Sequence, residues 1–268
     1  MRSSIAFLRN KVVEFAMERS RRGYARSRGD LSQDLSFTEA TRRFPDRNDL
    51  HAYMHRFFYE SLPETLRLHR EYFSKEGRGF GEPAFHSMWY LLLREFRPTN
   101  LLEIGVYRGQ VVSLWTLIGR ELSIPVGVRC ISPFSSAGDQ VSRYRQLDYL
   151  EDVMRNFDHF QLPRPNYLKG FSTDPQAIAY LRAEPLDFVY IDGGHDYDVV
   201  LSDYRNSVDA LKPGGILVMD DASLGTNFAP PKFSFAGHPG PSKVAREIAD
   251  KELQFLGGVG HQNVYRKP

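Results

Sequence analysis

Three carboxylates follow two short apolar segments and could together bind a cation. Asp192 comes directly after the apolar run 188–191, and Asp220 and Asp221 come directly after a second run, 216–219. Carboxylates gathered at one rim repel and raise one another's pKa, which a bound divalent cation relieves. Mg²⁺ in proteins usually takes one or two carboxylates and several waters, so the pattern predicts a Mg²⁺ site. The alternative is that Asp220 caps a loop and Asp192 accepts a backbone hydrogen bond.

A histidine lies close to the first of these acids in the sequence. His195 follows Asp192 by three residues, after two glycines that let the loop bend. A lone histidine is more often structural or exposed than functional. The three carboxylates would favour its imidazolium form, whereas a bound cation would oppose it. The neighbouring Asp196 is an alternative base, or merely a hydrogen-bond acceptor.

A glycine-containing turn follows an earlier apolar segment, 101–104. Glu103, Gly105 and Gly109 form a Glu-x-Gly-x-x-x-Gly string, with Tyr107 at the place of a middle glycine. The spacing differs from the dinucleotide-binding fingerprint. An acid is unfavourable beside a pyrophosphate and suits a cationic ligand. Two glycines of purely structural use explain the string equally well.

Short apolar strands alternate with amphipathic helices after Pro98, and this order predicts how the motifs are positioned. We expect strands at 101–104, 126–131, 167–169, 188–191 and 216–219, with a turn at 213–215. We expect helices at 110–122, 141–157, 177–181, 200–211 and 243–253. The pattern predicts an α/β fold with a doubly wound, mostly parallel, seven-stranded Rossmann-like sheet and a terminal antiparallel hairpin. Ligands bind beyond the carboxyl ends of such strands, where all the residues named above lie.

The residues before this sheet form an N-terminal helical extension. A helical stripe runs from Asp49 to Leu62, Pro63 interrupts it, and another helix spans 85–96. We divide the chain into an accessory region, 1–80, and a sheet domain, 81–268. Residues 1–28 carry eight basic and two acidic groups. This segment could contact an anionic membrane or a partner, or pack on its own domain or a dimer mate.

Composition limits the class of protein. The chain has 268 residues, a net charge of +2 and 41% hydrophobic residues, which excludes wholesale disorder and gives no general reason to expect nucleic acid. A single cysteine, Cys130, excludes an intramolecular disulfide framework and suits a reducing compartment. We find no membrane span, and expect a cytoplasmic homo-oligomer. The long loop 224–241 is either a lid that carries aromatic side chains to a substrate or a mobile surface loop.

Three motifs together resemble those of the class I S-adenosylmethionine (SAM)-dependent methyltransferases. Leu-Leu-Glu-Ile-Gly-Val-Tyr-Arg-Gly at 101–109 is similar to the first motif of that family. Tyr-Ile-Asp-Gly-Gly-His at 190–195 and the segment 211–221 are similar to its fourth and fifth strand motifs. The order and spacing agree across about residues 80–268, and the resemblance implies SAM as cofactor. The cofactor residues that it implies are Glu103, Gly105, Tyr107, Gly109, Ser132, Gly170, Ser172 and Asp192.

The acids are placed as in the metal-dependent small-molecule O-methyltransferases, particularly the macrolide-sugar and cephalosporin-hydroxylase-like groups. The resemblance implies Mg²⁺ on Asp192, Asp220 and Asp221, with His195 as general base and Asp192 as a second catalytic residue. It also implies transfer of the SAM methyl group to a hydroxyl of a small polyhydroxylated acceptor, in the biosynthesis of a natural product or glycan.

One departure from this family concerns the end of the second strand. The family usually has an acid there that holds the ribose, whereas this chain has Ser132. A hydroxyl cannot replace two carboxylate oxygens, so a non-catalytic SAM-fold or partner-binding module is the main alternative. A nucleic-acid methyltransferase is disfavoured. Enzymes that methylate the amino groups of bases carry an Asn/Asp-Pro-Pro-aromatic motif after the fourth strand, whereas this chain has Asp-Gly-Gly-His there. An NAD-dependent oxidoreductase is also disfavoured, because this chain lacks both the glycine spacing of the dinucleotide fingerprint and the acid after the second strand.

Overall fold

A single mixed sheet organises the chain. The computed structural model describes residues 15–27, 34–137 and 147–268. The sheet has the order β3-β2-β1-β4-β5-β7-β6, in which β1 to β5 pair in parallel and β7 is antiparallel to both β5 and β6. The predicted fold class, with its terminal hairpin, is confirmed. The strands are β1 Asn100–Ile104, β2 Gly127–Ser132, β3 Asn166–Lys169, β4 Leu186–Ile191, β5 Leu211–Met219, β6 Gln254–Val259 and β7 Gln262–Arg266.

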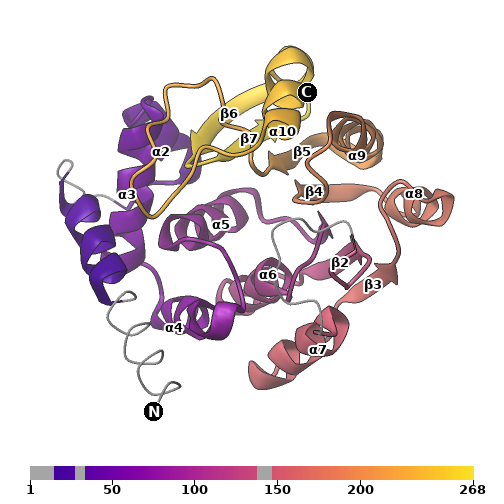
Figure 1. Cartoon of the computed structure of the whole chain (residues 1–268), viewed down its shortest axis with the longest axis horizontal. Coiled ribbons are helices and arrows are strands. Elements are labelled where there is room, and N and C mark those ends of the chain that lie inside the picture. The colour runs from indigo at the N-terminus through magenta and orange to yellow at the C-terminus, as the bar shows by residue number, and fades with distance from the viewer. Residues whose placement is uncertain (1–14, 28–33, 138–146) are drawn as a thin grey trace.

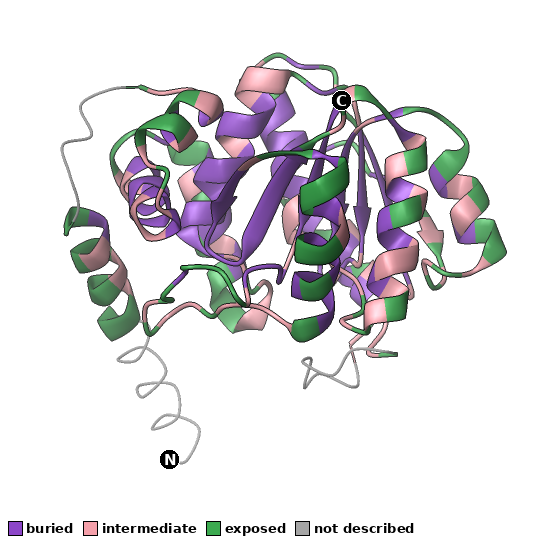
Figure 2. Ribbon diagram, turned by 90° about the horizontal axis from the view of Figure 1, so that it is seen from above, coloured by how far each residue is buried: buried purple, intermediate pink, exposed green. Residues whose placement is uncertain are grey.

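Helices cover both faces of the sheet, with α5, α6 and α7 on one side and α8, α9 and α10 on the other (Figure 1). Their solvent-facing sides are exposed and their sheet-facing sides are buried (Figure 2). Residues 15–26 are helical, Lys75–Gly77 is a 3-10 turn, and a π-helical turn, Ala245–Ala249, joins α10 to α11. The helices are α2 Phe37–Arg43, α3 Arg47–Glu60, α4 Glu64–Ser74, α5 Pro83–Phe96, α6 Gln110–Glu121, α7 Tyr149–His159, α8 Pro175–Arg182, α9 Tyr197–Ala210, α10 Pro239–Val244 and α11 Asp250–Glu252.

Local signals explain where the early helices begin. Ser36 caps α2 through a reciprocal capping box with Glu39, and the side chain of Asp46 accepts two backbone N–H groups at the start of α3. Pro63 separates α3 from α4, because proline can begin a helix but cannot continue one. The proline at the first position of α5, Pro83, follows the same rule.

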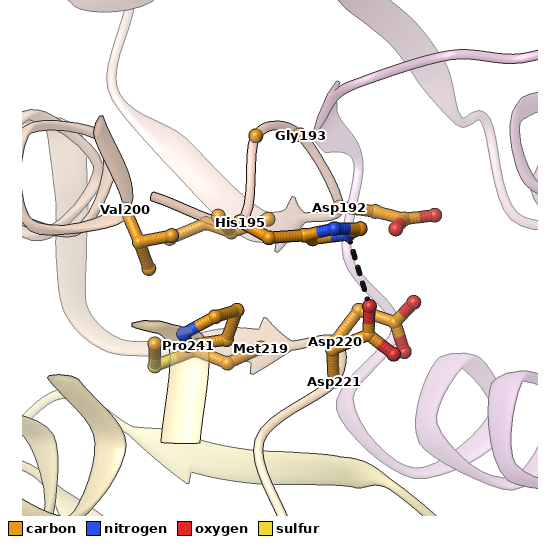
Figure 3. Close-up of a pocket in the computed structure, with 10 residues that line it drawn as sticks. Asp192, Gly193, His195, Val200, Met219, Asp220, Asp221 and Pro241 are labelled. Atoms are coloured by element: carbon orange, nitrogen blue, oxygen red, sulfur yellow. Dashed lines mark ion pairs between the residues drawn. The ribbon is translucent and has the colours of Figure 1, made fainter. Parts of the chain in front are cut away.

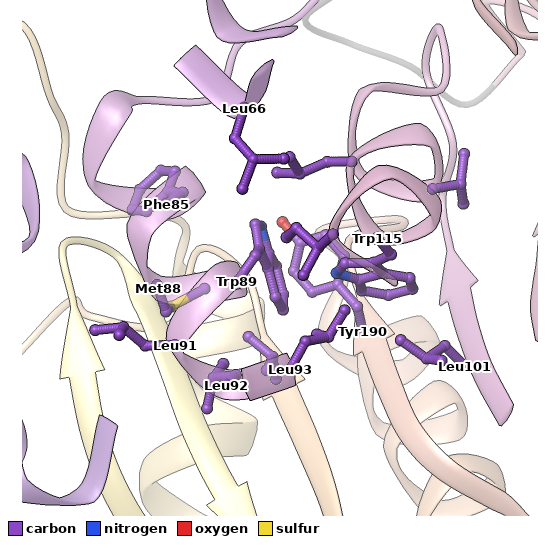
Figure 4. Close-up of a cluster of buried hydrophobic side chains, with 14 of the residues drawn as sticks. Leu66, Phe85, Met88, Trp89, Leu91, Leu92, Leu93, Leu101, Trp115 and Tyr190 are labelled. Carbon is purple, nitrogen blue, oxygen red and sulfur yellow. The ribbon is translucent and has the colours of Figure 1, made fainter. Parts of the chain in front are cut away.

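The larger hydrophobic core joins the N-terminal helices to the sheet. Trp89 of α5 lies with its ring centroid 5.4 Å from that of Trp115 on α6 and 4.9 Å from that of Tyr190 on β4 (Figure 4). Leu50 and Met54 of α3 belong to this same cluster. Helices of the region 1–80 therefore share a core with the sheet, and the boundary at residue 80 stays a prediction.

The described part of the basic N-terminal segment packs on its own chain. Ala25 is buried, and the guanidinium of Arg22 lies 4.5 Å from the ring centroid of Tyr59 on α3. Phe15, at the start of this helix, is exposed. Residues 1–14 and 28 lie outside the described residues, so membrane contact by this segment stays a proposal. Among the described helices, none combines the length and the apolar character needed to cross a bilayer.

Two segments differ from their predicted limits. Residues 213–215 lie within β5 as a bulge rather than before it, because pairing with β4 shifts between Leu186 and Phe188 while Gly214 bonds to the C-terminal segment. Gly214 has a φ of +79°, which glycine adopts without strain. The last major helix begins at Pro239 rather than at 243. The predicted helix 141–157 is described only from Tyr149, since residues 138–146 lie outside the described part.

Candidate functional site

The carboxyl ends of β4 and β5 bring the predicted acids and the histidine together. Asp192 and His195 follow β4, Asp220 and Asp221 follow β5, and all four line one pocket (Figure 3). The Nε2 atom of His195 lies 3.0 Å from Oδ2 of Asp221. Adjacent parallel strands therefore produce the juxtaposition that the sequence predicted.

The backbone of Asp221 is held in an uncommon conformation. Its φ is +54°, a left-handed region that aspartate adopts more readily than most residues. Its carbonyl accepts hydrogen bonds from the His238 N–H at 2.9 Å and from the Ser242 hydroxyl at 3.0 Å. A Cβ on Gly237 would lie 2.3 Å from that same carbonyl oxygen, so this position requires glycine. The loop 224–241 thus fixes the direction of the Asp221 side chain.

Two further histidines face the acids, although no sequence motif places them at the site. The Nε2 atom of His261 lies 3.3 Å from Oδ1 of Asp220, and Nε2 of His238 lies 3.7 Å from Oδ2 of Asp221. The ring of His238 stacks on that of His195 with centroids 3.9 Å apart. His261 stands in the turn between β6 and β7, and antiparallel pairing of β7 with β5 brings that turn to the same rim. The predicted hairpin could have revealed it.

The acids are close enough to affect one another's protonation. Burial raises the pKa of Asp192 well above its usual value, and the charges of Asp220 and Asp221 raise it further. Burial likewise raises the pKa of Asp220, with a second contribution from Asp221. Without a cation, two neighbouring carboxyls with raised pKa values hold a proton between them. A bound cation would displace that proton.

The donor atoms at the rim fit a divalent cation. Among the described residues, no hydrogen bond reaches the buried Oδ1 atom of Asp221. Ligand atoms of Asp220, Asp221 and His261 lie within 4.8 Å of one another, as do those of His195, Asp221 and His238. Carboxylate oxygens suit Mg²⁺ and Mn²⁺, whereas imidazoles suit transition metals. The residues therefore fit a hard or borderline divalent cation.

The predicted cofactor turn lies directly beside this rim. Gly105 and Gly109 have φ values of +91° and +82°, which favour glycine. A Cβ on Gly105 would lie 1.9 Å from the carbonyl oxygen of Asp192, so Gly105 lets the turns after β1 and β4 meet. Burial raises the pKa of Glu103 well above its usual value, partly offset by the Val112 N–H. Its Oε2 atom accepts no hydrogen bond from the described residues, which suits a cationic ligand such as SAM.

The other predicted cofactor residues lie along the carboxyl ends of β1, β2 and β3. The Ser132 hydroxyl donates to the Val106 carbonyl at 2.9 Å and accepts from the Phe134 N–H at 3.2 Å, so its hydrogen bonds join two loops of the protein. The ring of Tyr107 stacks on that of Phe80 at 5.2 Å. Gly170 and Ser172 follow β3, which three strands, β2, β1 and β4, separate from β5.

The long loop 224–241 connects the rim to the N-terminal helices. Phe228 is buried against His51 of α3, with ring centroids 5.3 Å apart. Phe235 is half exposed and lies 4.5 Å from the ring centroid of His261. A Cβ on Gly240 would lie 2.0 Å from the His195 carbonyl oxygen, so the end of this loop packs closely on the turn after β4. The loop therefore borders the site, and its role as a lid stays a prediction.

Comparison with known sequences identifies the domain at this site. Residues 102–222 match the family described as a methyltransferase domain. An uncharacterized protein of Acanthamoeba polyphaga mimivirus is 26% identical over 147 residues, covering 52% of this chain and 60% of that protein. The chain thus spans about 60% of the length of the curated relative that it matches.

Solved structures share the fold. An O-methyltransferase from Bacillus cereus in complex with SAH is 17% identical, with a TM-score of 0.53 over 81% of this chain and 97% of that one. An SAH-bound methyltransferase from Podospora anserina is 15% identical, with a TM-score of 0.56 over 88% of this chain and 98% of that one. Residues 102–222 therefore match a methyltransferase-domain family, and the chain shares the fold of these solved methyltransferases.

Proposed function

We propose that the chain is a SAM-dependent O-methyltransferase that acts on a small hydroxylated acceptor and requires a divalent cation. The observation that carries the proposal is the convergence of Asp192, Asp220 and Asp221 beside the turn that holds Glu103. Structural similarity to an O-methyltransferase in complex with SAH supports it. When bound, SAM would supply the methyl group, and a cation on the three acids would lower the pKa of the acceptor hydroxyl.

The chain's own residues would hold and move the proton. Asp221 Oδ2 faces Nε2 of His195 at 3.0 Å. A neutral imidazole that donates from Nε2 carries its lone pair on Nδ1, so Nδ1 is the atom that would accept the proton of the hydroxyl. The carboxylate would stabilise the resulting imidazolium. Oδ1 of the same acid remains for the cation, and Asp192 and Asp220 complete the set.

The acceptor class follows from what borders the rim. Phe235 and His238 are partly exposed there, and aromatic rings stack on the apolar faces of sugars and other rings. We therefore propose a sugar or another polyhydroxylated compound of natural-product or glycan biosynthesis. A cytoplasmic, homo-oligomeric enzyme remains part of the proposal. The proposed compartment rests on composition, including a single cysteine, Cys130, that is buried.

Methyl transfer from isotopically labelled SAM to a panel of sugars, glycosides and catechols would test this function. Activity should appear with Mg²⁺ or Mn²⁺, disappear with EDTA and return when the cation is restored. The variant Asp221→Asn should be inactive while retaining its thermal unfolding transition. Methyl transfer that is unaffected by EDTA would overturn the cation requirement. Transfer of the labelled methyl group to nucleic acid, and to none of the small acceptors, would overturn the acceptor class.

A non-catalytic SAM-fold module is the second candidate, and the end of β2 favours it. Ser132 is buried, and its hydroxyl already bonds to Val106 and Phe134. It therefore does not offer the two free acceptor oxygens of the acid usual at this place. Titration calorimetry with SAM and with SAH decides between the candidates. Micromolar binding of either supports the enzyme, and no binding in the presence of Mg²⁺ supports the module.

A further inference from the structure

A second group of metal-ligand side chains lies outside the rim, between α3 and the start of α5. His51 and His55 are one helical turn apart on α3, and Glu82 immediately precedes α5. The three residues are 0%, 0% and 4% exposed. Both imidazole Nε2 atoms point at the same oxygen, Oε2 of Glu82, each at 3.2 Å. One candidate ligand atom from each residue lies within 4.8 Å of the other two.

These separations match a metal site. Zinc bonds to histidine nitrogen and carboxylate oxygen measure about 2.0–2.1 Å, and at a tetrahedral centre such bonds place neighbouring ligand atoms about 3.3–3.4 Å apart. The observed separation of 3.2 Å between each histidine Nε2 and Oε2 of Glu82 is close to this distance between ligand atoms. Two imidazoles and one carboxylate are also a ligand set that zinc uses, with a water at the fourth position.

One tautomer of His51 suits a cation at this point. The Tyr24 hydroxyl donates to the Asn48 carbonyl at 3.1 Å and lies 3.1 Å from Nδ1 of His51. In the tautomer whose Nδ1–H donates to this hydroxyl, the lone pair of Nε2 faces Glu82 and can bind a cation beside it. In the other tautomer, Nε2–H donates to Glu82 and the cluster is a hydrogen-bonded network.

The surroundings resemble the outer shell of a metal site. Metal-binding histidines usually donate their second ring N–H to an acceptor that fixes the ring. The Tyr24 hydroxyl is the acceptor available to Nδ1 of His51, whereas Nδ1 of His55 has no hydrogen-bond partner among the described residues. Phe233 lies over the cluster, with its ring centroid 5.2 Å from that of His55 and 5.6 Å from that of Tyr24. The positive charges of Arg21 and Arg70 act on this cluster and oppose a bound cation.

We propose that His51, His55 and Glu82 bind one zinc-class divalent cation that fastens α3 to the start of α5. Tyr24 is a positioning residue, which links the site to the helix 15–26, and Phe233 links it to the loop 224–241. This inference does not depend on methyl transfer. The ring of Phe85 neighbours both groups, with its centroid 6.5 Å from that of His51 and 4.7 Å from that of His261 at the rim.

Zinc titration of a variant without the three rim acids, Asp192→Asn with Asp220→Asn and Asp221→Asn, tests the proposal. We expect one zinc per chain by calorimetry and by elemental analysis, and a cobalt-loaded sample should show the intense visible absorption of tetrahedral nitrogen and oxygen coordination. Adding Tyr24→Phe should weaken zinc binding about 10–100-fold, as loss of an outer-shell partner does. Adding His55→Gln should abolish it.

A matched control is His159→Gln in the same background, since His159 is exposed on α7 and outside both sites. It should bind zinc as tightly as the background. Absence of zinc binding in the background protein would overturn the proposal and leave a hydrogen-bonded network. Equal affinity after His55→Gln would also overturn it. If His55→Gln does not fold, the cobalt spectrum and the Tyr24→Phe titration still decide.

Discussion

The carbonyl oxygen of Asp192 lies against Gly105, so that a methyl group on Gly105 would approach it to 1.9 Å. The contact joins the proposed cofactor turn to the proposed cation site, and Gly105 also has a φ of +91°. Each turn can therefore take its present shape only while the other does. Displacement of either turn should disturb both binding functions together.

The variant Gly105→Ala should destabilise the protein by more than about 2 kcal/mol, because an unfavourable left-handed backbone and a backbone clash add. Both SAM and Mn²⁺ should bind more weakly in calorimetry. Gly127→Ala is the matched control, since a Cβ on that strand residue would meet its nearest atom, the Thr99 carbonyl oxygen, at 3.4 Å. Similar denaturation midpoints for the two variants would contradict this account of Gly105.

Because His195 pairs with Asp221 at the rim, replacing His195 should lower the rate of methyl transfer and leave the affinity for the cofactor unchanged. His195→Gln should lower kcat about 10²–10⁴-fold, the usual effect of removing a general base, and should leave the SAM Kd nearly unchanged. The pH–rate profile should lose its acidic limb in the same variant. His159→Gln, outside the site, should keep wild-type kinetics. A variant that retained full kcat would remove His195 from the mechanism.

The raised pKa of Asp192 predicts how pH affects the cation-free protein. A carboxyl whose folded pKa exceeds its unfolded pKa contributes stability below the unfolded value and loses it as pH rises through the folded value. In EDTA at pH 8, Asp192→Asn should therefore unfold at a higher temperature than wild type. The variant should also lose most of the stabilisation by Mn²⁺, about 2.7 kcal/mol at one hundred times Kd.

Asp196→Asn, on the exposed part of the same loop, is the control for that measurement. It should show wild-type melting in EDTA and the same gain with Mn²⁺. If Asp192→Asn responded to Mn²⁺ as strongly as this control, Asp192 would not be a ligand.

A buried acid behind the rim predicts a second pH effect. Burial raises the pKa of Asp203 on α9 from 3.8 to about 7, with a partial offset from Ser172. Protonated Asp203 therefore contributes fully to the free energy of unfolding below about pH 4, and this contribution is lost as the pH rises to 7. The stability gained by Asp203→Asn should increase by about 2–3 kcal/mol between pH 5 and pH 8.

Urea denaturation at the two pH values measures this difference. Asp198→Asn, exposed on the first turn of the same helix, should change stability by less than about 0.5 kcal/mol at either pH. An equal pH response in the two variants would show that Asp203 is not the titrating group.

The histidines at the rim predict which cation binds most tightly. Imidazole ligands raise the affinity for Mn²⁺ and Co²⁺ more than for Mg²⁺. Competition calorimetry should therefore show a preference for the transition metals, and His261→Ala should reduce that preference more than it reduces Mg²⁺ affinity. Unchanged ratios in His261→Ala would mean that His261 pairs with Asp220 without binding the cation.

Much of the fold could be predicted from the sequence because its signals are local. Alternating apolar strands and amphipathic helices after Pro98 determine a parallel sheet, and parallel strands must end at one edge. Asp192 and Asp220 follow adjacent strands, so their meeting required no knowledge of side-chain packing. The structure supports the same reasoning for His195, whose short loop leaves it near the end of β4.

The tertiary structure alone decided the contacts between elements that are distant in the chain. His261 reaches the acids only through antiparallel pairing of β7 with β5, and His238 only because a long loop bonds back to Asp221. Glu82 meets His51 only when α5 packs on α3. Periodicity and spacing act over a few residues, so they determine the elements and their ends. Which side chains from different elements then converge depends on packing, which brought His238 and His261 to the rim and Glu82 to the two histidines of α3.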